Sequence, residues 1–124
     1  MYAGISQEIY VNGEFILNEI PVETVNGYQF IALYSKSMLM NKLHAAYRWT
    51  RATKEFTLLI DEYEFEFKCG SDIMKLADKE IKLPAPVMLI DGVPAIPLKV
   101  ICDKVGYTYS YNEKTKRIDI KTNR

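Results

Sequence analysis

The chain has 124 residues, 48% of them hydrophobic and 26% charged, which is typical of one globular domain and far from the composition of disordered segments. Sixteen Lys and Arg balance sixteen Asp and Glu, so the protein lacks the positive field that binding to nucleic acid or to an anionic membrane requires. No apolar stretch approaches the roughly 20 residues of a membrane-spanning helix, so we expect no membrane insertion.

The first residues and the two cysteines bear on the cellular location and on the redox state of the thiols. Residues 1–6 lack the basic and apolar regions of a secretory signal, so we expect either a cytoplasmic protein or a mature fragment carrying an added Met. Cys69 and Cys102 are too far apart for a CxxC redox pair. Two free thiols and one disulfide both stay open, and two thiols are favoured because free Cys is a common core residue.

The first half of the chain predicts hairpins around one helix. Asn12-Gly13 lies between short strands and Asn26-Gly27 between apolar strand residues, as two-residue hairpin turns do. Leu39, Met40 and Leu43 follow at helical spacing, and His44 comes at the end of that helix.

The middle of the chain predicts a hairpin with one buried face. Tyr63, Phe65 and Phe67 alternate with Glu62, Glu64 and Glu66, which indicates a strand with one face in the core and one in water. We expect this strand to pair with residues 56–60 across Asp61-Glu62.

The second half repeats the order of the first. Residues 77–79 are a less ideal turn, and Asp91-Gly92 is a strong one. Pro97 suits a first helical position, and Gly106 stops the amphipathic helix that follows. The alternation of Tyr107, Tyr109 and Tyr111 with Thr108 and Ser110, then of Ile118 and Ile120 with charged residues after a polar loop, predicts a further hairpin.

Matching residues recur at a constant offset. An offset of 65 residues aligns Gly27 with Gly92 and Ile31 with Ile96, and an offset of 62 then aligns Trp49 with Tyr111. The difference of three predicts a longer helix in the first copy. We therefore expect an α+β fold of two tandem repeats, residues 1–61 and 62–124, each made of antiparallel β-hairpins packed on one short helix, and both packed as one compact unit.

The apolar periodic positions predict the core of both copies. They are Ile31, Leu33, Leu39, Leu43, Trp49, Phe56, Ile96, Leu98, Ile101, Val105, Tyr111 and Ile118.

These motifs carry a family likeness. Ile90-Asp91-Gly92, Ile96-Pro97-Leu98, the helix stop at Gly106 and the run from Tyr111 to Ile118 resemble the copper amine oxidase-like N-terminal domain, a stalk-type repeat of exported and cell-wall proteins of Gram-positive bacteria. In the first copy Ala32 replaces the Pro, and His44 the Gly. The resemblance implies an extracellular or wall-associated setting, and it implies no catalysis, since the copper and quinone of the oxidases belong to another domain.

The residue inventory also argues against an enzyme. One histidine, His44, is too few for a copper site or for a nucleophilic triad within one chain, so we expect no catalytic residues, no metal and no cofactor. The acidic run of residues 61–66 is expected to be the solvent face of a strand. Tyr107 and Tyr109 could form a platform for sugar rings, although packing over the helix is favoured for a half-buried strand face.

Two functions follow as hypotheses. The first is a non-catalytic structural or binding module of a bacterial cell-surface or wall protein, with cell-wall polymer as partner. The second is a protein-interaction or oligomerisation module, including self-association, that acts through exposed sheet edges. Polymer contact, if present, is expected at whichever of four tyrosines are accessible: Tyr28, Tyr63, Tyr107 and Tyr109.

Overall fold

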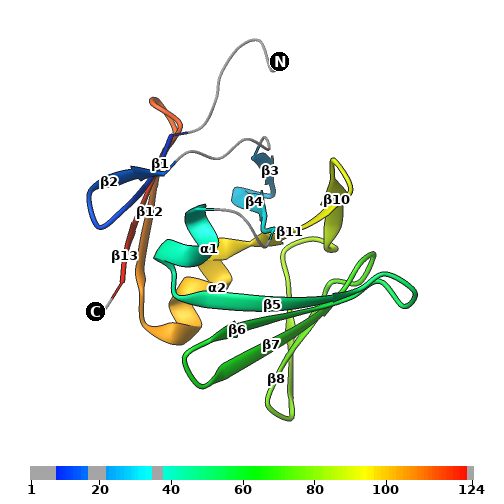
Figure 1. The fold of residues 1–124 in the computed structure, drawn as a ribbon. Helices are drawn as coiled ribbons and strands as arrows, with labels where there is room; N and C mark the ends of the chain where they lie inside the picture. Colours follow the sequence, from blue (N-terminus) through cyan, green and yellow to red (C-terminus); the bar gives the residue numbers. More distant parts are fainter. Residues whose placement is uncertain (1–7, 17–21, 35–37, 123–124) are drawn as a thin grey trace.

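The structure, a computed structural model, describes residues 8–16, 22–34 and 38–122. These residues form thirteen strands in three sheets and two helices, α1 (Met38–Lys42) and α2 (Leu98–Val105). Figure 1 shows the helices in the middle of the molecule with the sheets arranged around them. The described chain is thus mostly β-sheet with two short helices, in agreement with the expected α+β class.

The first sheet, sheet A, joins strands from both ends of the chain. Its order is β12 (Thr108–Asn112), β13 (Arg117–Lys121), β1 (Glu8–Val11), β2 (Glu14–Ile16). β1 and β2 form the hairpin expected at Asn12-Gly13, while β1 and β13 run parallel. Two hydrogen bonds of the Asn12 side chain support the pairing of β1 with β13. Its Nδ2 donates to Thr122 Oγ1 at 3.0 Å, and its Oδ1 accepts from the Thr122 N–H at 3.0 Å.

Sheet B consists of two hairpins side by side. Its order is β10 (Met88–Ile90), β11 (Val93–Pro97), β4 (Tyr28–Ala32), β3 (Glu23–Val25). The turns are the predicted Asn26-Gly27 and Asp91-Gly92, and all four turn residues have positive φ, as this turn type requires. The two hairpins meet through β4 and β11, where Ile31 lies opposite Ile96 and both side chains are fully buried.

Sheet C is an antiparallel meander of five consecutive strands. They are β5 (Ala45–Thr50), β6 (Glu55–Ile60), β7 (Tyr63–Lys68), β8 (Ile73–Leu76) and β9 (Lys79–Lys82). Ile60 lies opposite Tyr63, so the predicted pairing across Asp61-Glu62 is confirmed. Phe65 and Phe67 are buried while the glutamates between and before them are exposed, as their alternation predicted.

Helix α2 begins and ends at the predicted residues with one adjustment. Pro97, expected as the first helical residue, is instead the N-cap residue and the last residue of β11, so the helix begins one residue later, at Leu98. Gly106 adopts the left-handed conformation with φ 84°, and the Tyr107 N–H donates to the Cys102 carbonyl at 2.9 Å, which closes the helix C-terminus.

The expected longer helix in the first half is not what the described residues contain. α1 has five residues and α2 has eight. β11 continues directly into α2 through Pro97, whereas β4 ends at Ala32 and α1 begins only at Met38. Residues 35–37, which precede α1, lie outside the described part. Neither described helix is long and apolar enough to cross a membrane.

The predicted core is confirmed at ten of its twelve positions. Trp49 and Tyr111 are the exceptions, because both are half-buried and pack against the edge of the main core cluster. They lie on β5 and β12, which are edge strands, so neighbouring side chains cover them from one side only. The buried ten are Ile31, Leu33, Leu39, Leu43, Phe56, Ile96, Leu98, Ile101, Val105 and Ile118.

The boundary expected between residues 61 and 62 falls in the turn that joins β6 to β7. Each of the three sheets combines strands from both sides of this boundary. The two segments 1–61 and 62–124 therefore interlock through backbone hydrogen bonds and share their core.

Candidate functional site

Tyr107 offers no accessible ring. Its side chain is 4% exposed, and its hydroxyl donates a hydrogen bond of 3.1 Å to the backbone carbonyl of Leu43, near the end of α1. Burial raises the pKa of this phenol. Tyr107 is therefore not among the accessible tyrosines: it packs in the core, which was the favoured alternative, and links α1 to the start of β12.

Tyr109 is half-buried and also has an internal partner. Its hydroxyl donates to Gln29 Oε1 at 2.7 Å, and Gln29 is itself buried in β4. Desolvation raises the pKa of Tyr109 strongly, so this phenol stays protonated and acts as a donor. The hydrogen bond ties sheet A to sheet B, which is a structural role.

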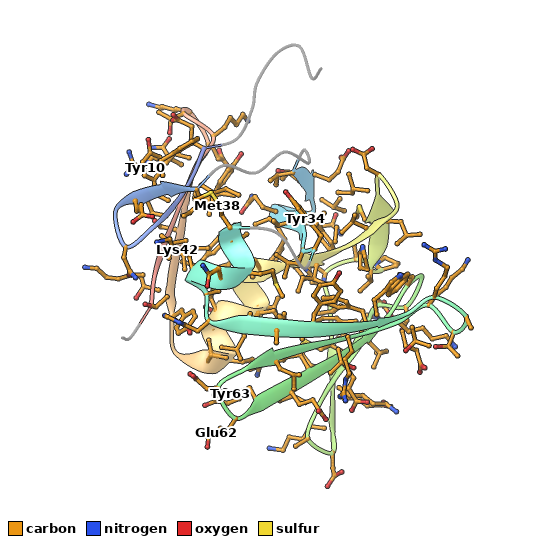
Figure 2. All side chains as sticks on the ribbon, in the orientation of Figure 1. Tyr10, Tyr34, Met38, Lys42, Glu62 and Tyr63 are labelled. Atoms are coloured by element: carbon orange, nitrogen blue, oxygen red, sulfur yellow. The ribbon has the colours of Figure 1, made fainter. Side chains whose placement is uncertain are left out.

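The other two candidate tyrosines lie apart from these and from each other. Tyr28 is half-buried on β4, packed against a small cluster on the outer side of sheet B. Tyr63 lies at the β6–β7 turn, where its ring stacks on Phe65 with centroids 6.1 Å apart. Figure 2 places Tyr63 near the bottom of the view, far from Tyr10. The four predicted tyrosines thus form no single platform.

A different aromatic pair lies on the outward face of sheet A. Tyr10 on β1 and Phe15 on β2 are directly opposite in the hairpin register, and their rings meet edge to face with centroids 5.6 Å apart. Phe15 is 50% exposed, the largest exposed fraction among the exposed large hydrophobic residues described. Figure 2 shows Tyr10 on this outer side of the molecule. The pair therefore presents one exposed ring, Phe15, beside the half-buried ring of Tyr10.

Arg117 on β13 extends this pair into a row. Its guanidinium carbon lies 3.7 Å from the centre of the Tyr10 ring, a cation–π contact. The same guanidinium donates two hydrogen bonds to Asp119, from Nε at 2.9 Å and from Nη2 at 3.0 Å. The hydrogen bond with Asp119 raises the pKa of Arg117, which therefore remains charged. We call Phe15, Tyr10, Arg117 and Asp119 the aromatic row.

An open hollow of about 630 Å³ adjoins the aromatic row at Asp119. Within it, Asn112 Oδ1 accepts hydrogen bonds from the N–H groups of Lys114 and Thr115, at 2.9 Å and 3.2 Å, and so holds the β12–β13 loop. These bonds do not use the Asn112 amide nitrogen. The hollow is lined by Ser110, Tyr111, Asn112, Glu113, Lys114 and Asp119.

The sequence contains a signal for the aromatic pair. A two-residue Asn12-Gly13 turn places Val11 opposite Glu14 and Tyr10 opposite Phe15. Because Ile9 and Val11 are the buried positions of β1, Tyr10 must point the other way. Arg117 could not be found in this manner, because its position beside Tyr10 depends on the parallel pairing of β1 with β13.

The histidine and the two cysteines lie outside the aromatic row and the hollow. His44 is exposed and follows α1 with φ 59°. It corresponds to Gly106, which follows α2. Cys69 and Cys102 are free thiols, and burial raises the pKa of both, so they are protonated at neutral pH. Within residues 8–16, 22–34 and 38–122, no group of three His, Cys, Asp or Glu side chains could hold a metal ion.

Comparison with protein families identifies the chain. The model of the copper amine oxidase N-terminal domain matches residues 32–120, from the last residue of β4 to near the end of β13. The chain belongs to the copper amine oxidase N-terminal domain family. Searches of curated proteins and of solved structures each return no significant match.

The family name refers to amine oxidation, but the domain that the family describes does not carry out this reaction. In the oxidases, the N-terminal domain is a non-catalytic domain. The matched residues include both helices, all of sheet C and the β12–β13 hairpin. Tyr10 and Phe15 precede the matched residues, so the family match by itself says nothing of the aromatic pair.

Proposed function

We propose that this copper amine oxidase N-terminal domain is a non-catalytic structural or binding module that works outside the membrane, at the surface or in the wall of a Gram-positive bacterium. The observation that carries the proposal is the family match over residues 32–120 to a non-catalytic domain. A formal net charge of zero supports it, because a spacer or wall module must not adhere to nucleic acid or lipid.

The interlocked fold supports a role in which the chain keeps its shape under load. β1 near one end of the described chain and β13 near the other pair directly, and Asn12 and Thr122 exchange hydrogen bonds beside them. The two ends are therefore held together by several backbone bonds. Such a closed unit resists fraying from either end, which suits a stalk or spacer.

We also propose that the chain consists of two tandem copies of one unit. β8, β10 and β11 begin and end 65 residues after β1, β3 and β4. Trp49 opposite Phe56 and Tyr111 opposite Ile118 occupy equivalent pairs at an offset of 62. The central pair Ile31 and Ile96 matches under the same offset of 65, as expected when an approximate two-fold axis passes between β4 and β11. Experimental coordinates in which the two halves fail to superimpose would contradict this proposal.

Binding to isolated cell walls tests the functional proposal. Purified protein is mixed with walls from a Gram-positive bacterium and sedimented, with an unrelated globular protein of similar size and charge as control. We expect greater retention of this chain than of the control. Fractionation of cells carrying the natural gene provides an independent check, since recovery of the protein only from the cytoplasm would contradict the proposed location.

A second candidate function is supported by the edge of sheet B. β10 is an edge strand made only of Met88, Leu89 and Ile90, and Leu89 is 45% exposed. The edge strand β9 of sheet C, in contrast, carries Lys79 and Lys82, which discourage strand addition. An uncharged apolar edge can accept a strand of another chain.

Sedimentation velocity over a range of protein concentrations tests the second candidate. We expect a mass that rises with concentration in wild type and stays monomeric in Leu89→Lys, because a charge on the edge opposes pairing. A monomeric wild type at every concentration would remove self-association through β10 from consideration.

A further inference from the structure

We propose that the aromatic row and the adjoining hollow on the outward face of sheet A form a binding subsite for an uncharged glycan. This inference rests on the proposed role at the cell wall and names the chemistry that the binding surface accepts.

The exposed ring supplies an apolar contact of the right kind. A pyranose ring has one face of C–H groups and a rim of hydroxyls, so it needs a flat apolar surface with hydrogen-bonding groups beside it. The half-exposed Phe15 ring provides the flat surface, and Tyr10 supports it from β1 through an edge-to-face contact of 5.6 Å.

The row is held in place before any ligand arrives. The guanidinium of Arg117 stacks on Tyr10 at 3.7 Å and is clamped by two hydrogen bonds to Asp119. Arg117 and Asp119 lie on β13, which pairs with β1, and β1 in turn pairs with β2, the strand that carries Phe15. Little side-chain freedom remains to be lost on binding, which favours recognition of a weakly interacting sugar.

Hydrogen-bonding groups lie where the hydroxyl rim would be. Asp119 belongs both to the aromatic row and to the hollow of about 630 Å³, whose lining also includes Ser110 and Asn112. Carboxylate, hydroxyl and amide groups side by side can accept from and donate to sugar hydroxyls. A chain of several rings can therefore run from Phe15 across the sheet into the hollow.

The charges of this face favour an uncharged polymer over a polyanion. Arg117 is neutralised by Asp119 through the two hydrogen bonds between them. The acidic residues of the face and hollow equal the basic ones in number, with Glu8, Glu113 and Asp119 against Lys114, Arg117 and Lys121. No excess of positive charge is present to attract a phosphate-containing polymer.

Heteronuclear NMR titration of the full chain tests this inference, with soluble cello-oligosaccharides and chito-oligosaccharides as probes. We expect millimolar binding, with chemical-shift changes at Tyr10, Phe15, Asp119 and the hollow residues. Phe15→Ala should weaken binding about tenfold, because the stacking surface is lost. Leu89→Ala, which removes an equally exposed apolar side chain from sheet B, should leave the affinity unchanged.

The Arg117→Lys variant tests whether the two hydrogen bonds to Asp119 matter apart from the positive charge. Lysine keeps the positive charge but cannot stack on Tyr10 and bond Asp119 at two points, so we expect weaker glycan binding in a folded protein. Thermal unfolding of each variant shows that the fold is retained.

Three outcomes would overturn the inference. They are the absence of shifts with both oligosaccharides, equal affinity of wild type and Phe15→Ala, and concentration-dependent shifts of the same residues without ligand, which would make this face a contact between two copies. Retention on walls that persists without oligosaccharide binding, or binding only to a polyglycerol phosphate and abolished by salt, would overturn the glycan assignment and leave the wall-associated function standing.

Discussion

Cys102 links the stability of the fold to pH. Its thiol lies on α2 and is 1% exposed. Burial raises its pKa from the ordinary value of 9.0 to about 12; the neighbouring Asp103 carboxylate acts in the same direction, and Lys99 opposes it. In the unfolded chain the thiol loses its proton near its ordinary pKa, whereas the folded protein retains the proton until about pH 12.

The pKa shift has a definite sign for stability. Above pH 9 the unfolded state releases the Cys102 proton and gains free energy that the folded state cannot gain. The contribution of Cys102 to the free energy of unfolding is therefore complete below pH 9 and is lost as the pH rises toward 12. At about pH 10, which is one unit above the ordinary pKa of the thiol, the loss amounts to about 1.4 kcal/mol.

The measurement is urea unfolding followed by the fluorescence of Trp49, the single tryptophan, for wild type and Cys102→Ala at several pH values up to about pH 10. The variant is less stable at neutral pH because a small cavity forms. The difference between the two proteins should shrink by about 1.4 kcal/mol between pH 7 and pH 10, since only wild type carries the thiol.

A matched control comes from Cys69. Burial raises its pKa as well, while Lys54 opposes the shift, and the side chain is only half-buried. Cys69→Ala should therefore change the pH dependence less than Cys102→Ala does. Tyr107 and Tyr109 also have raised pKa values, but they are present in every protein compared, so their effect cancels. Parallel pH curves for wild type and Cys102→Ala would refute this account of the buried thiol.

Four further predictions follow from individual contacts. Tyr107→Phe should lower the free energy of unfolding by about 1 to 3 kcal/mol, because the buried Leu43 carbonyl loses its donor, and thermal unfolding measures this. Gly106→Ala should destabilise by about 1 to 2 kcal/mol at its left-handed backbone, while His44→Gly at φ 59° should be neutral or stabilising; equal effects of the two changes would contradict the conformational argument. Trp49→Ala should cost about 2 to 3 kcal/mol, below the 3 to 5 kcal/mol of a fully buried ring, and a loss below about 1 kcal/mol would show that the ring contributes little packing. The protein should retain no stoichiometric copper after dialysis, because the chain has one histidine; one bound copper per chain would disprove this expectation.

The match between sequence pattern and structure is best where the pattern is local. The turns at Asn26-Gly27 and Asp91-Gly92, the α2 stop at Gly106 and the alternation of residues 62–67 all depend on backbone φ or on side-chain period within a few residues. The family resemblance depends on the same motifs, and the match over residues 32–120 confirms it.

Which of the four candidate tyrosines are accessible could not be predicted from the sequence, because accessibility depends on residues far away along the chain. The alternation of Tyr107 and Tyr109 correctly assigned both to the inward face of a strand, and their hydroxyls then found partners in Leu43 and Gln29, more than 60 residues away. Tyr10 is turned outward by the same kind of alternation on β1, between the buried Ile9 and Val11.

The sequence by itself determined the main hairpin turns, the buried face of strands such as β7, the second helix and the family, because these follow from turn chemistry and from periods of two and 3.6 residues. Only the tertiary structure decided which hairpins became neighbours. The parallel pairing of β1 with β13 joins residues separated by about the whole chain, and nothing in either strand alone specifies that partner. That pairing brings Arg117 over Tyr10 and creates the aromatic row, so the proposed binding surface is a product of the long-range packing.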